Sequence, residues 1–436
     1  MLWRPACGSA AAFSPEPIWT FRPGGGRSQV AAPRAEPVKP SEVPTDLHDL
    51  LEGTVALPLL SANAVADGGA AAIVDLRSPA EFADDHLPGA RNRPLFDNEE
   101  RALIGFLYHR ASPGEAFDRG IELLRERLTE LVAGILEEAG IEGVDLSRIP
   151  AELEALTSAG QHGLEELLAP FEAEPESRVP LVVHCWRGGL RSQSVLALLR
   201  RLGVDAYGLQ GGYKHYRRWV LDGLEQCEPL PTFVLAGLTG VGKTLVLREL
   251  ERQRTGWTLD LEGIAQHRSS TLGMVGLDPV SQKLFDGGCL QRLRAGFPEP
   301  WMVVEGESRK VGDVIIPARL WSAMQDGRRL ELTAPLDVRV KVLSDDYLAR
   351  AGSREQLAER LPFIEQRLGK KRFDGVLTGL LAEDRIDELV EVLLERYYDP
   401  LYRHSEGDRT YEARVDTSDP AACAAEIADW IERQRD

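Results

Sequence analysis

Long apolar runs, paired cysteines and an N-terminal signal pattern are all missing from this sequence. No stretch approaches the roughly 20 apolar residues that a membrane-spanning helix needs, so we expect no membrane partner. The five cysteines among 436 residues are scattered without a C-x-x-C pair, which argues against a disulfide framework or a zinc site. Residues 1–13 lack the uninterrupted apolar core of a secretory signal. These absences predict a protein of the reducing cytoplasm.

Basic residues are outnumbered by acidic residues. The 51 Lys and Arg residues against 69 Asp and Glu residues give a formal net charge of −18, which opposes indiscriminate binding to nucleic acids. Binding through a local basic face stays open, because residues 213–219 and 370–373 interleave basic with aromatic side chains. For either segment alone, a solvated helix face is an equally good explanation.

The composition changes twice along the chain and predicts two folded domains. Residues 1–48 are rich in Ala, Pro, Gly and Arg without apolar periodicity, which predicts a disordered extension. Residues 49–226 would form the first domain, and the proline-containing segment 227–231 a linker. Residues 232–436 would form the second domain, with a helical C-terminal part.

Short apolar strands alternate with helical patterns in both predicted domains. This alternation predicts an α/β protein with parallel sheets covered on both faces. We expect strands at residues 71–76, 180–184, 206–209, 233–236, 257–261, 301–305 and 330–333. We expect helical segments at residues 115–140, 150–170 and 189–202.

A cysteine follows the predicted strand at 180–184 and opens a glycine-rich loop. In the segment His184-Cys185-Trp186-Arg187-Gly188-Gly189-Leu190-Arg191-Ser192, the two glycines allow backbone N–H groups to converge on an anion. Arg187 and Arg191 add positive charge, as does the N-terminus of the following helix. This environment favours a reactive thiolate at Cys185, so we predict Cys185, Arg187 and Arg191 as catalytic residues.

A complete Walker A motif follows the predicted strand at 233–236. In the segment Gly237-Leu238-Thr239-Gly240-Val241-Gly242-Lys243-Thr244, Gly237, Gly240 and Gly242 let the backbone wrap a diphosphate. Lys243 would neutralise the terminal phosphates, and Thr244 can ligate Mg²⁺. The motif indicates a polyphosphate ligand but does not by itself indicate nucleotide hydrolysis.

Carboxylates at the ends of two neighbouring predicted strands are candidates for the same site. Asp260 and Glu262 follow one strand, and Glu305 and Glu307 end another, with Arg309 close behind. Glu305 or Glu307 could bind a metal through water or act as a base, and Asp260 and Glu262 could line the site, although strand-end acids also cap helices. We predict these five residues to support the Walker A site and leave the metal itself unassigned.

The surroundings of Cys185 resemble the rhodanese fold. Residues 73–82 and the segment His86-Leu87-Pro88-Gly89-Ala90 resemble its strand, its Asp-x-Arg turn and its His-Ile-Pro-Gly-Ala element. We expect Asp75, Arg77 and His86 to hold loops in place. The His-Cys-x5-Arg-Ser spacing also matches phosphatase loops, which keeps a phosphatase open.

Several segments together resemble the bacterial tRNA 2-selenouridine synthases, in which a rhodanese domain is fused to a P-loop domain. The segments that carry the resemblance are residues 184–192, 209–217, 237–244, 260–270, 279–283 and 304–312. The resemblance implies a rhodanese-like parallel-sheet domain followed by a P-loop NTPase-like parallel-sheet domain. Gly306 and Asp85 depart from the family pattern, at a position that is often acidic and at one that is usually glycine.

The resemblance implies that sulfur is replaced by selenium in the wobble 2-thiouridine of certain tRNAs. The sulfur would first be alkylated with geranyl diphosphate, held around Lys243, and the S-geranyl group then displaced using selenophosphate at Cys185. No tightly bound cofactor is implied, and a Mg²⁺ requirement is left open, as is covalent carriage of selenium by Cys185. The anticodon region of the tRNA would then contact some of the basic and aromatic candidates, which are Tyr213, Lys214, Tyr216, Arg217, Lys370, Lys371 and Arg372.

Two other functions compete with this interpretation. A two-headed phosphotransfer protein would combine a phosphatase-like Cys185 domain with a small-molecule kinase domain. A non-enzymatic protein would use the first domain only as a binding module that regulates the P-loop domain. The sequence leaves open which tRNAs are modified and how many copies of the chain assemble.

Overall fold

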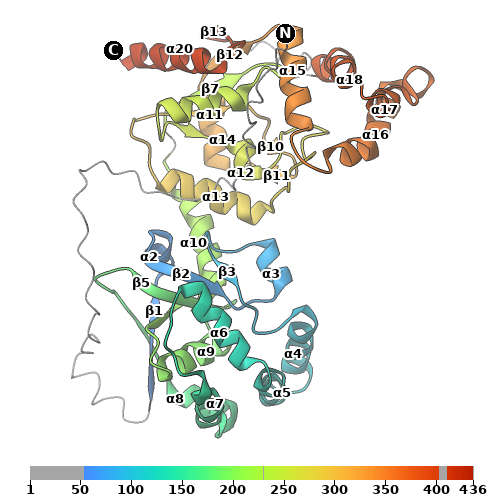
Figure 1. Cartoon of the computed structure of the whole chain (residues 1–436). Helices are drawn as coiled ribbons and strands as arrows, with labels where there is room; N and C mark the ends of the chain where they lie inside the picture. Colours follow the sequence, from blue (N-terminus) through green and yellow to red (C-terminus); the bar gives the residue numbers. More distant parts are fainter. Residues whose placement is uncertain (1–53, 229, 402–409, 436) are drawn as a thin grey trace, which may run out of the picture. The chain divides into compact units, whose positions relative to one another are not determined.

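The computed structural model describes residues 54–228, 230–401 and 410–435, which belong to one compact unit. Two parallel sheets carry the two glycine-rich loops (Figure 1). We call residues 54–227 the cysteine-loop half and residues 232–435 the P-loop half. The predicted disordered extension, residues 1–48, lies outside the described residues.

The sheet of the cysteine-loop half has six strands, all parallel, in the order β3-β2-β5-β6-β1-β4. Its central strand β5 is buried on both faces: Val182 faces one apolar cluster, and Leu181 and Val183 face another. Burial on both faces explains the continuous apolar run in the sequence. The strands are β1 (Val55–Leu60), β2 (Ala70–Asp75), β3 (Arg91–Asn92), β4 (Leu168–Glu172), β5 (Val179–His184) and β6 (Ala206–Leu209).

Helices connect these strands, and several begin at clear capping residues. At the start of α3, Ser78 and Glu81 form a capping box in front of Pro79, which satisfies backbone N–H groups of the first turn. The helices of this half are α2 (Ala62–Ala66), α3 (Pro79–Asp84), α4 (Asn98–Arg110), α5 (Pro113–Arg125), α6 (Leu128–Ala139), η1 (Leu146–Arg148), α7 (Ile149–Thr157), α8 (Gly160–Leu167), α9 (Leu190–Arg201) and α10 (Gly212–Gln226).

The sheet of the P-loop half has five parallel strands in the order β13-β12-β7-β9-β8. Its strands are β7 (Thr232–Ala236), β8 (Thr258–Leu259), β9 (Met302–Glu305), β12 (Arg328–Thr333) and β13 (Ala413–Asp416), and a small antiparallel pair is formed by β10 (Lys310–Val311) and β11 (Val314–Ile315). The helices around it are α11 (Lys243–Gln253), α12 (Leu261–Ala265), α13 (Gln282–Arg294), α14 (Ala318–Asp326), α20 (Pro420–Glu432) and η3 (Arg433–Arg435).

A helical lobe, residues 336–398, is part of the P-loop half and has its own apolar cluster. In Figure 1, α15 lies next to the five-stranded sheet, and α16, α17 and α18 lie on the other side of α15. The longest, α16, departs from helical geometry at Gly369. The elements of the lobe are α15 (Leu336–Tyr347), α16 (Ser353–Phe373), α17 (Val376–Ala382), α18 (Ile386–Leu393) and the π-helix η2 (Leu394–Tyr398).

The α/β class and the parallel sheets are confirmed, and each predicted strand overlaps an observed one. The helical prediction for 150–170 is wrong at its end, where residues 168–172 form β4 beside β1. The prediction also misses β1 and β3 of the six-stranded sheet, β13 of the five-stranded sheet, and the antiparallel pair of β10 and β11. A boundary near residues 227–231 agrees with the change of sheet, but one apolar cluster contains residues of both halves, among them Tyr216 of α10 and Phe285 of α13. The division into separate domains therefore stays a prediction.

Candidate functional site

The Cys185 loop lies at the carboxyl end of the central strand β5 and leads into α9. Two backbone bonds hold it from the start of α10: Tyr213 N donates to Cys185 O at 2.9 Å, and Lys214 N donates to Trp186 O at 2.8 Å. The approach is so close that a Cβ on Gly212 would lie 2.5 Å from Cys185 O. The second glycine pair, 211–212, is therefore a structural part of the cysteine loop, which the sequence motif alone does not indicate.

Cys185 has one side-chain partner, Ser192. The Cys185 side chain is buried, and its Sγ lies 3.1 Å from Ser192 Oγ. Arg187 is exposed and Arg191 half-buried, and neither has an ion pair within the part of the chain that the structure describes. Arg187 lies in the loop itself and Arg191 in the first turn of α9.

Behind the loop lies a buried network of charged groups. The Arg77 guanidinium donates to Asp75 Oδ2 at 2.9 Å and to Asp85 O at 2.6 Å, and its central carbon lies 3.8 Å from the centre of the Tyr213 ring. The Tyr213 hydroxyl donates to the Asp85 carboxylate. Asp75 and Arg77 thus hold the loops together, as predicted.

Burial affects the ionisation of these carboxyl groups in two ways. Burial by itself raises the pKa of Asp75, but the charge of His184 and the bonds from Arg77 outweigh it, so the pKa is lower than usual. For Asp85 burial dominates, and its pKa is raised despite the Tyr213 bond and the charge of Arg217. The third residue that was expected to hold loops in place, His86, stacks its ring on that of Phe82, with ring centres 4.1 Å apart.

The Walker A loop joins β7 to α11 as its motif predicts. Lys243 Nζ donates to Gly237 O at 3.3 Å, so the lysine lies folded over its own loop. Gly240 has a φ of 80°, and a Cβ there would lie 3.0 Å from Arg339 O. Arg339, in α15, donates to Thr239 O at 2.9 Å and 2.8 Å and pairs with Asp399. Sequence reasoning missed Arg339, which only the fold brings to the loop.

The predicted carboxylates do meet beside Lys243. Thr244 Oγ1 donates to Glu262 Oε2 at 2.8 Å, and Glu262 N donates to Glu305 Oε1 at 2.7 Å. Asp260 caps α12 through a 2.6 Å bond from Gly263 N. Arg309 is exposed and, among the described residues, makes no ion pair with these acids.

Burial raises the pKa values of the carboxyl groups at this site, and neighbouring acids add to the effect at Glu262 and Glu305. Burial, followed by the charge of Glu307, raises the pKa of Glu262 to about 8, although Lys243 and Thr244 act in the opposite direction. Burial also raises the pKa of Glu305 well above its usual range, with Asp260 and Glu262 adding to it. Burial also raises the pKa of Glu307, although Lys243 and Ser269 act in the opposite direction. At neutral pH this site therefore carries less negative charge than its composition indicates.

The tRNA-binding candidates on α10 require a correction. Tyr213 and Tyr216 are buried, so their side chains are not available to RNA. Arg217 is half-buried and paired with Asp286 at 2.6 Å, and its role in binding RNA stays a prediction. Sequence periodicity could have indicated the burial of the two tyrosines, because 213, 216, 220 and 224 share one apolar helix face. Lys214 is exposed, as are the three candidates on α16, Lys370, Lys371 and Arg372.

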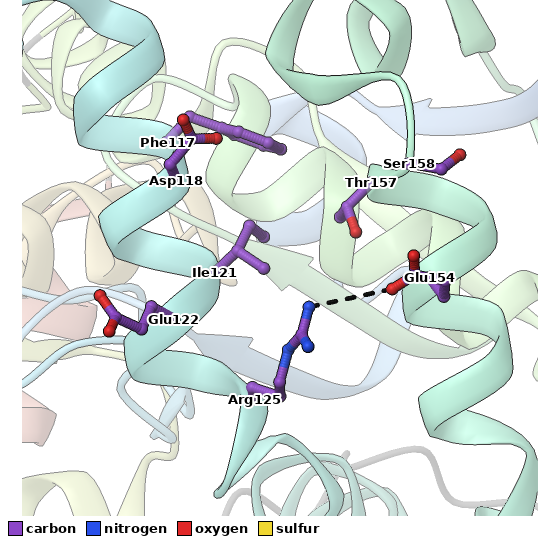
Figure 2. Close-up of a pocket in the computed structure, with 8 residues that line it drawn as sticks. All are labelled: Phe117, Asp118, Ile121, Glu122, Arg125, Glu154, Thr157 and Ser158. Atoms are coloured by element: carbon purple, nitrogen blue, oxygen red, sulfur yellow. Dashed lines mark ion pairs between the residues drawn. The ribbon is translucent and has the colours of Figure 1, made fainter.

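A surface hollow of about 420 Å³ lies away from both loops, between α5 and α7. Figure 2 shows Arg125 and Glu154 pointing toward each other across it, 3.8 Å apart. None of the predicted site residues lines this hollow. Within the described ranges, no helix is both long and apolar enough to span a bilayer.

A parallel sheet that ends in a Walker A loop, together with a second parallel sheet that ends in a cysteine loop, defines an α/β protein with a P-loop-like half. Residues 230–435 match the family model described as the tRNA 2-selenouridine synthase AAA domain. The chain is 31% identical to the tRNA 2-selenouridine synthase of Chromohalobacter salexigens over 82% of this chain and 94% of the relative. It is 32% identical to that of Cupriavidus necator over 83% of this chain and 94% of the relative. The chain belongs to the tRNA 2-selenouridine synthase family.

Proposed function

We propose that this protein is an enzyme that converts 2-thiouridine at the wobble position of tRNA into 2-selenouridine. The observation that carries the proposal is the presence of two separate glycine-rich loops, one with Lys243 and one with Cys185, in a chain that matches this family over most of its length. The proposed reaction consumes two anionic co-substrates, a diphosphate and selenophosphate. One loop is therefore available for each.

In the first step, the P-loop would hold geranyl diphosphate. The uridine sulfur attacks the first carbon of the geranyl group, a C–S bond forms, and the C–O bond breaks as diphosphate leaves with the electron pair. Lys243 and the backbone N–H groups of the loop stabilise the charge that develops on the leaving diphosphate. Because Glu262 holds a proton at neutral pH, it adds no repulsion against that charge.

In the second step, the Cys185 loop would supply selenium from selenophosphate. Selenium attacks carbon 2 of the base, the C–Se bond forms, and the C–S bond breaks with geranyl thiolate as the leaving group. Hydrolysis of the P–Se bond releases phosphate, whose oxygens Arg187 and Arg191 can grip. Alkylation in the first step is needed because a thiocarbonyl sulfur is a poor leaving group.

The residues present fit a Mg²⁺ ion that is bound mainly through the diphosphate. Within the described part of the chain, no three His, Cys, Asp or Glu side chains are grouped closely enough to hold a metal by themselves. Thr244 Oγ1 lies at the end of the loop beside Glu262, and Mg²⁺ commonly takes one or two protein ligands plus phosphate oxygens and water. Thr244 would hold the ion, and Glu262 would do so only after losing its proton. The ion would screen the diphosphate charge, while Lys243 orients the leaving group.

Nucleoside mass spectrometry of a 2-thiouridine tRNA tests the proposal. The tRNA is incubated with geranyl diphosphate, selenophosphate and the wild-type, Cys185→Ala or Lys243→Ala protein. We expect 2-selenouridine from the wild type, S-geranyl-2-thiouridine accumulating with Cys185→Ala, and neither product with Lys243→Ala. Cys227→Ser and Lys341→Ala, at a half-buried free cysteine and an exposed lysine, serve as matched controls that keep activity. Unaltered 2-thiouridine with the wild type would overturn the proposal, and ATP turnover that needs Lys243 would favour phosphotransfer.

A further inference from the structure

The exposed face of α16 combines cations and aromatic rings. Arg360, Phe363 and Arg367 follow a spacing of three and four residues, which places them on one helix face, and the Arg367 guanidinium lies 4.9 Å from the centre of the Phe363 ring. The Phe363 side chain is 50% exposed. Beyond the break at Gly369, Lys370, Lys371 and Arg372 are all exposed. We call these six residues the α16 surface.

The charges of the α16 surface are not neutralised by neighbours. Most exposed arginines of this acidic protein are paired, as in Arg328–Glu412 and Arg385–Glu388. Within the described ranges, no carboxylate forms an ion pair with any cation of the α16 surface. A positive patch left unpaired in a chain of net charge −18 is suited to an anionic partner.

The loop of residues 266–277 contacts the helical lobe on one side and the residues around Lys243 on the other. On the lobe side, Gly276 N donates to Gln356 Oε1 of α16 at 2.8 Å. The Tyr397 hydroxyl lies 2.9 Å from Thr271 Oγ1 and accepts a 3.4 Å bond from Arg367. On the site side, His267 N of the same loop donates to Glu262 O at 3.2 Å, and the Glu262 side chain accepts the bond from Thr244.

The backbone of this loop adopts an uncommon conformation at two residues. Gln266 and Ser269 have φ values of 50° and 51°, a region that non-glycine residues seldom adopt. Ser269 N donates to His267 Nδ1 at 3.0 Å, and Arg268 pairs with Asp346 of α15. The tethers hold the loop between the helical lobe and the residues around Lys243.

We propose that the α16 surface binds the anticodon loop of the RNA substrate, with Phe363 stacking on an unpaired base and Lys370 and Lys371 contacting its phosphates. Single-stranded loops are recognised by stacking on exposed aromatic rings and arginine planes, combined with backbone phosphate contacts. The helical part of the α16 surface, from Arg360 to Arg367, covers about 10 Å, and the other three cations follow the break at Gly369. This inference rests on the proposed function only in its choice of tRNA as the RNA.

Fluorescence anisotropy with an unmodified tRNA anticodon stem-loop tests this proposal on the full chain. We expect Lys370→Gln/Lys371→Gln to weaken binding about tenfold and to reduce the slope of log K against log salt by about 1.5, since each lost phosphate contact removes about 0.7–0.9. Arg252→Gln/Arg433→Gln removes equal charge at exposed positions of α11 and η3 and should bind like the wild type. Equal loss in both double variants, or in neither, would overturn the proposal.

The stacking role proposed for Phe363 is tested separately. Phe363→Ala should weaken stem-loop binding about tenfold, since stacking on one base contributes about 1–3 kcal/mol, with an unchanged salt slope, and Phe363→Trp should restore binding. A fully paired RNA duplex should bind less tightly and show no effect of Phe363. If the duplex binds equally well and Phe363→Ala is silent, the α16 surface is a general polyanion site and the proposal fails.

These outcomes are separable from the failure of the proposed function. The binding probe carries no 2-thiouridine, and no co-substrate is present. If the wild type makes no 2-selenouridine but the variants lose stem-loop binding, only the proposed function is overturned. If 2-selenouridine forms with the same kcat/KM for tRNA in the wild type and in Lys370→Gln/Lys371→Gln, only the α16 inference is overturned.

Discussion

Thr244 Oγ1 donates a 2.8 Å hydrogen bond to Glu262 Oε2, which ties the last residue of the Walker A motif to a carboxyl group that holds its proton at neutral pH. The pKa of Glu262 is raised to about 8 by burial and by the nearby Glu307. The carboxyl group is therefore neutral below that pH and negatively charged above it. A bound diphosphate would lie close to this charge.

Geranyl diphosphate binding should therefore weaken as the pH rises past 8. If the diphosphate binds only the protonated form, affinity falls about fivefold between pH 8 and pH 9, because the protonated fraction drops from about one half to about one tenth. Isothermal titration calorimetry from pH 6.5 to 9 measures this. Glu262→Gln, which stays neutral, should bind with little change over the same range. A wild-type pH profile equal to that of Glu262→Gln would show that Glu262 does not titrate beside the ligand.

Ser192 should set the reactivity of the Cys185 thiol. Its hydroxyl lies 3.1 Å from Cys185 Sγ, and a hydrogen bond to a charged group contributes about 1.5–3 kcal/mol. We expect Ser192→Ala to slow alkylation of Cys185 by iodoacetamide about tenfold at pH 7, followed by mass spectrometry of the Cys185 peptide. Ser194→Ala is the matched control, because Ser194 Oγ donates to Leu190 O in the same helix at 2.7 Å. Equal rates in the two variants would contradict the role given to Ser192.

Gly212 should tolerate no side chain, although it lies outside the cysteine motif. A Cβ at this position would lie 2.3 Å from Gly188 N and 2.5 Å from Cys185 O, and its φ is 61°. Backbone atoms cannot move aside cheaply, and the left-handed conformation alone costs a non-glycine residue about 1–3 kcal/mol. Gly212→Ala should therefore lower the free energy of unfolding by at least about 2 kcal/mol in urea denaturation.

Gly189→Ala is the control for this prediction. A Cβ there meets no atom within 4 Å, and the residue has an extended φ of −93°. Its free energy of unfolding should stay within about 0.5 kcal/mol of the wild type. Comparable losses at 189 and 212 would mean that the contact between the two glycine pairs does not hold the loop.

Local sequence patterns were sufficient for the parts of the fold and site that are local. The Walker A loop and the Cys185 loop lie where strand, glycines and helix follow one another directly, and both are confirmed in position. The buried strands β2, β5 and β7 were found because burial on both faces gives a continuous apolar run. The edge strands β4 and β13 were not, because half of each strand is exposed and the pattern is weak.

Contacts between distant residues could not be read from the sequence. Arg339 reaches Thr239 from 100 positions away, and only the packing of α15 on the Walker A loop brings them together. For the same reason Tyr213 was expected on an RNA-binding surface, whereas a long-range partner, Asp85, holds it inside. A segment rich in basic and aromatic residues can form either an exposed binding surface or a buried network. Its contacts with residues far away in the sequence determine which of the two it forms.

The hydroxyl of Tyr213 should be important for stability, because it is the donor to the buried carboxylate of Asp85. Tyr213→Phe leaves that acceptor without its donor, and an unsatisfied buried group costs about 1–3 kcal/mol. Tyr216→Phe is the matched control, since within the described residues no hydrogen bond is formed by the equally buried Tyr216 hydroxyl. Urea denaturation should show the loss for Tyr213→Phe only. In Asp85→Ala, where the carboxylate is absent, Tyr213→Phe should cost at least about 1 kcal/mol less, and equal costs in both backgrounds would show that the two side chains do not act as a pair.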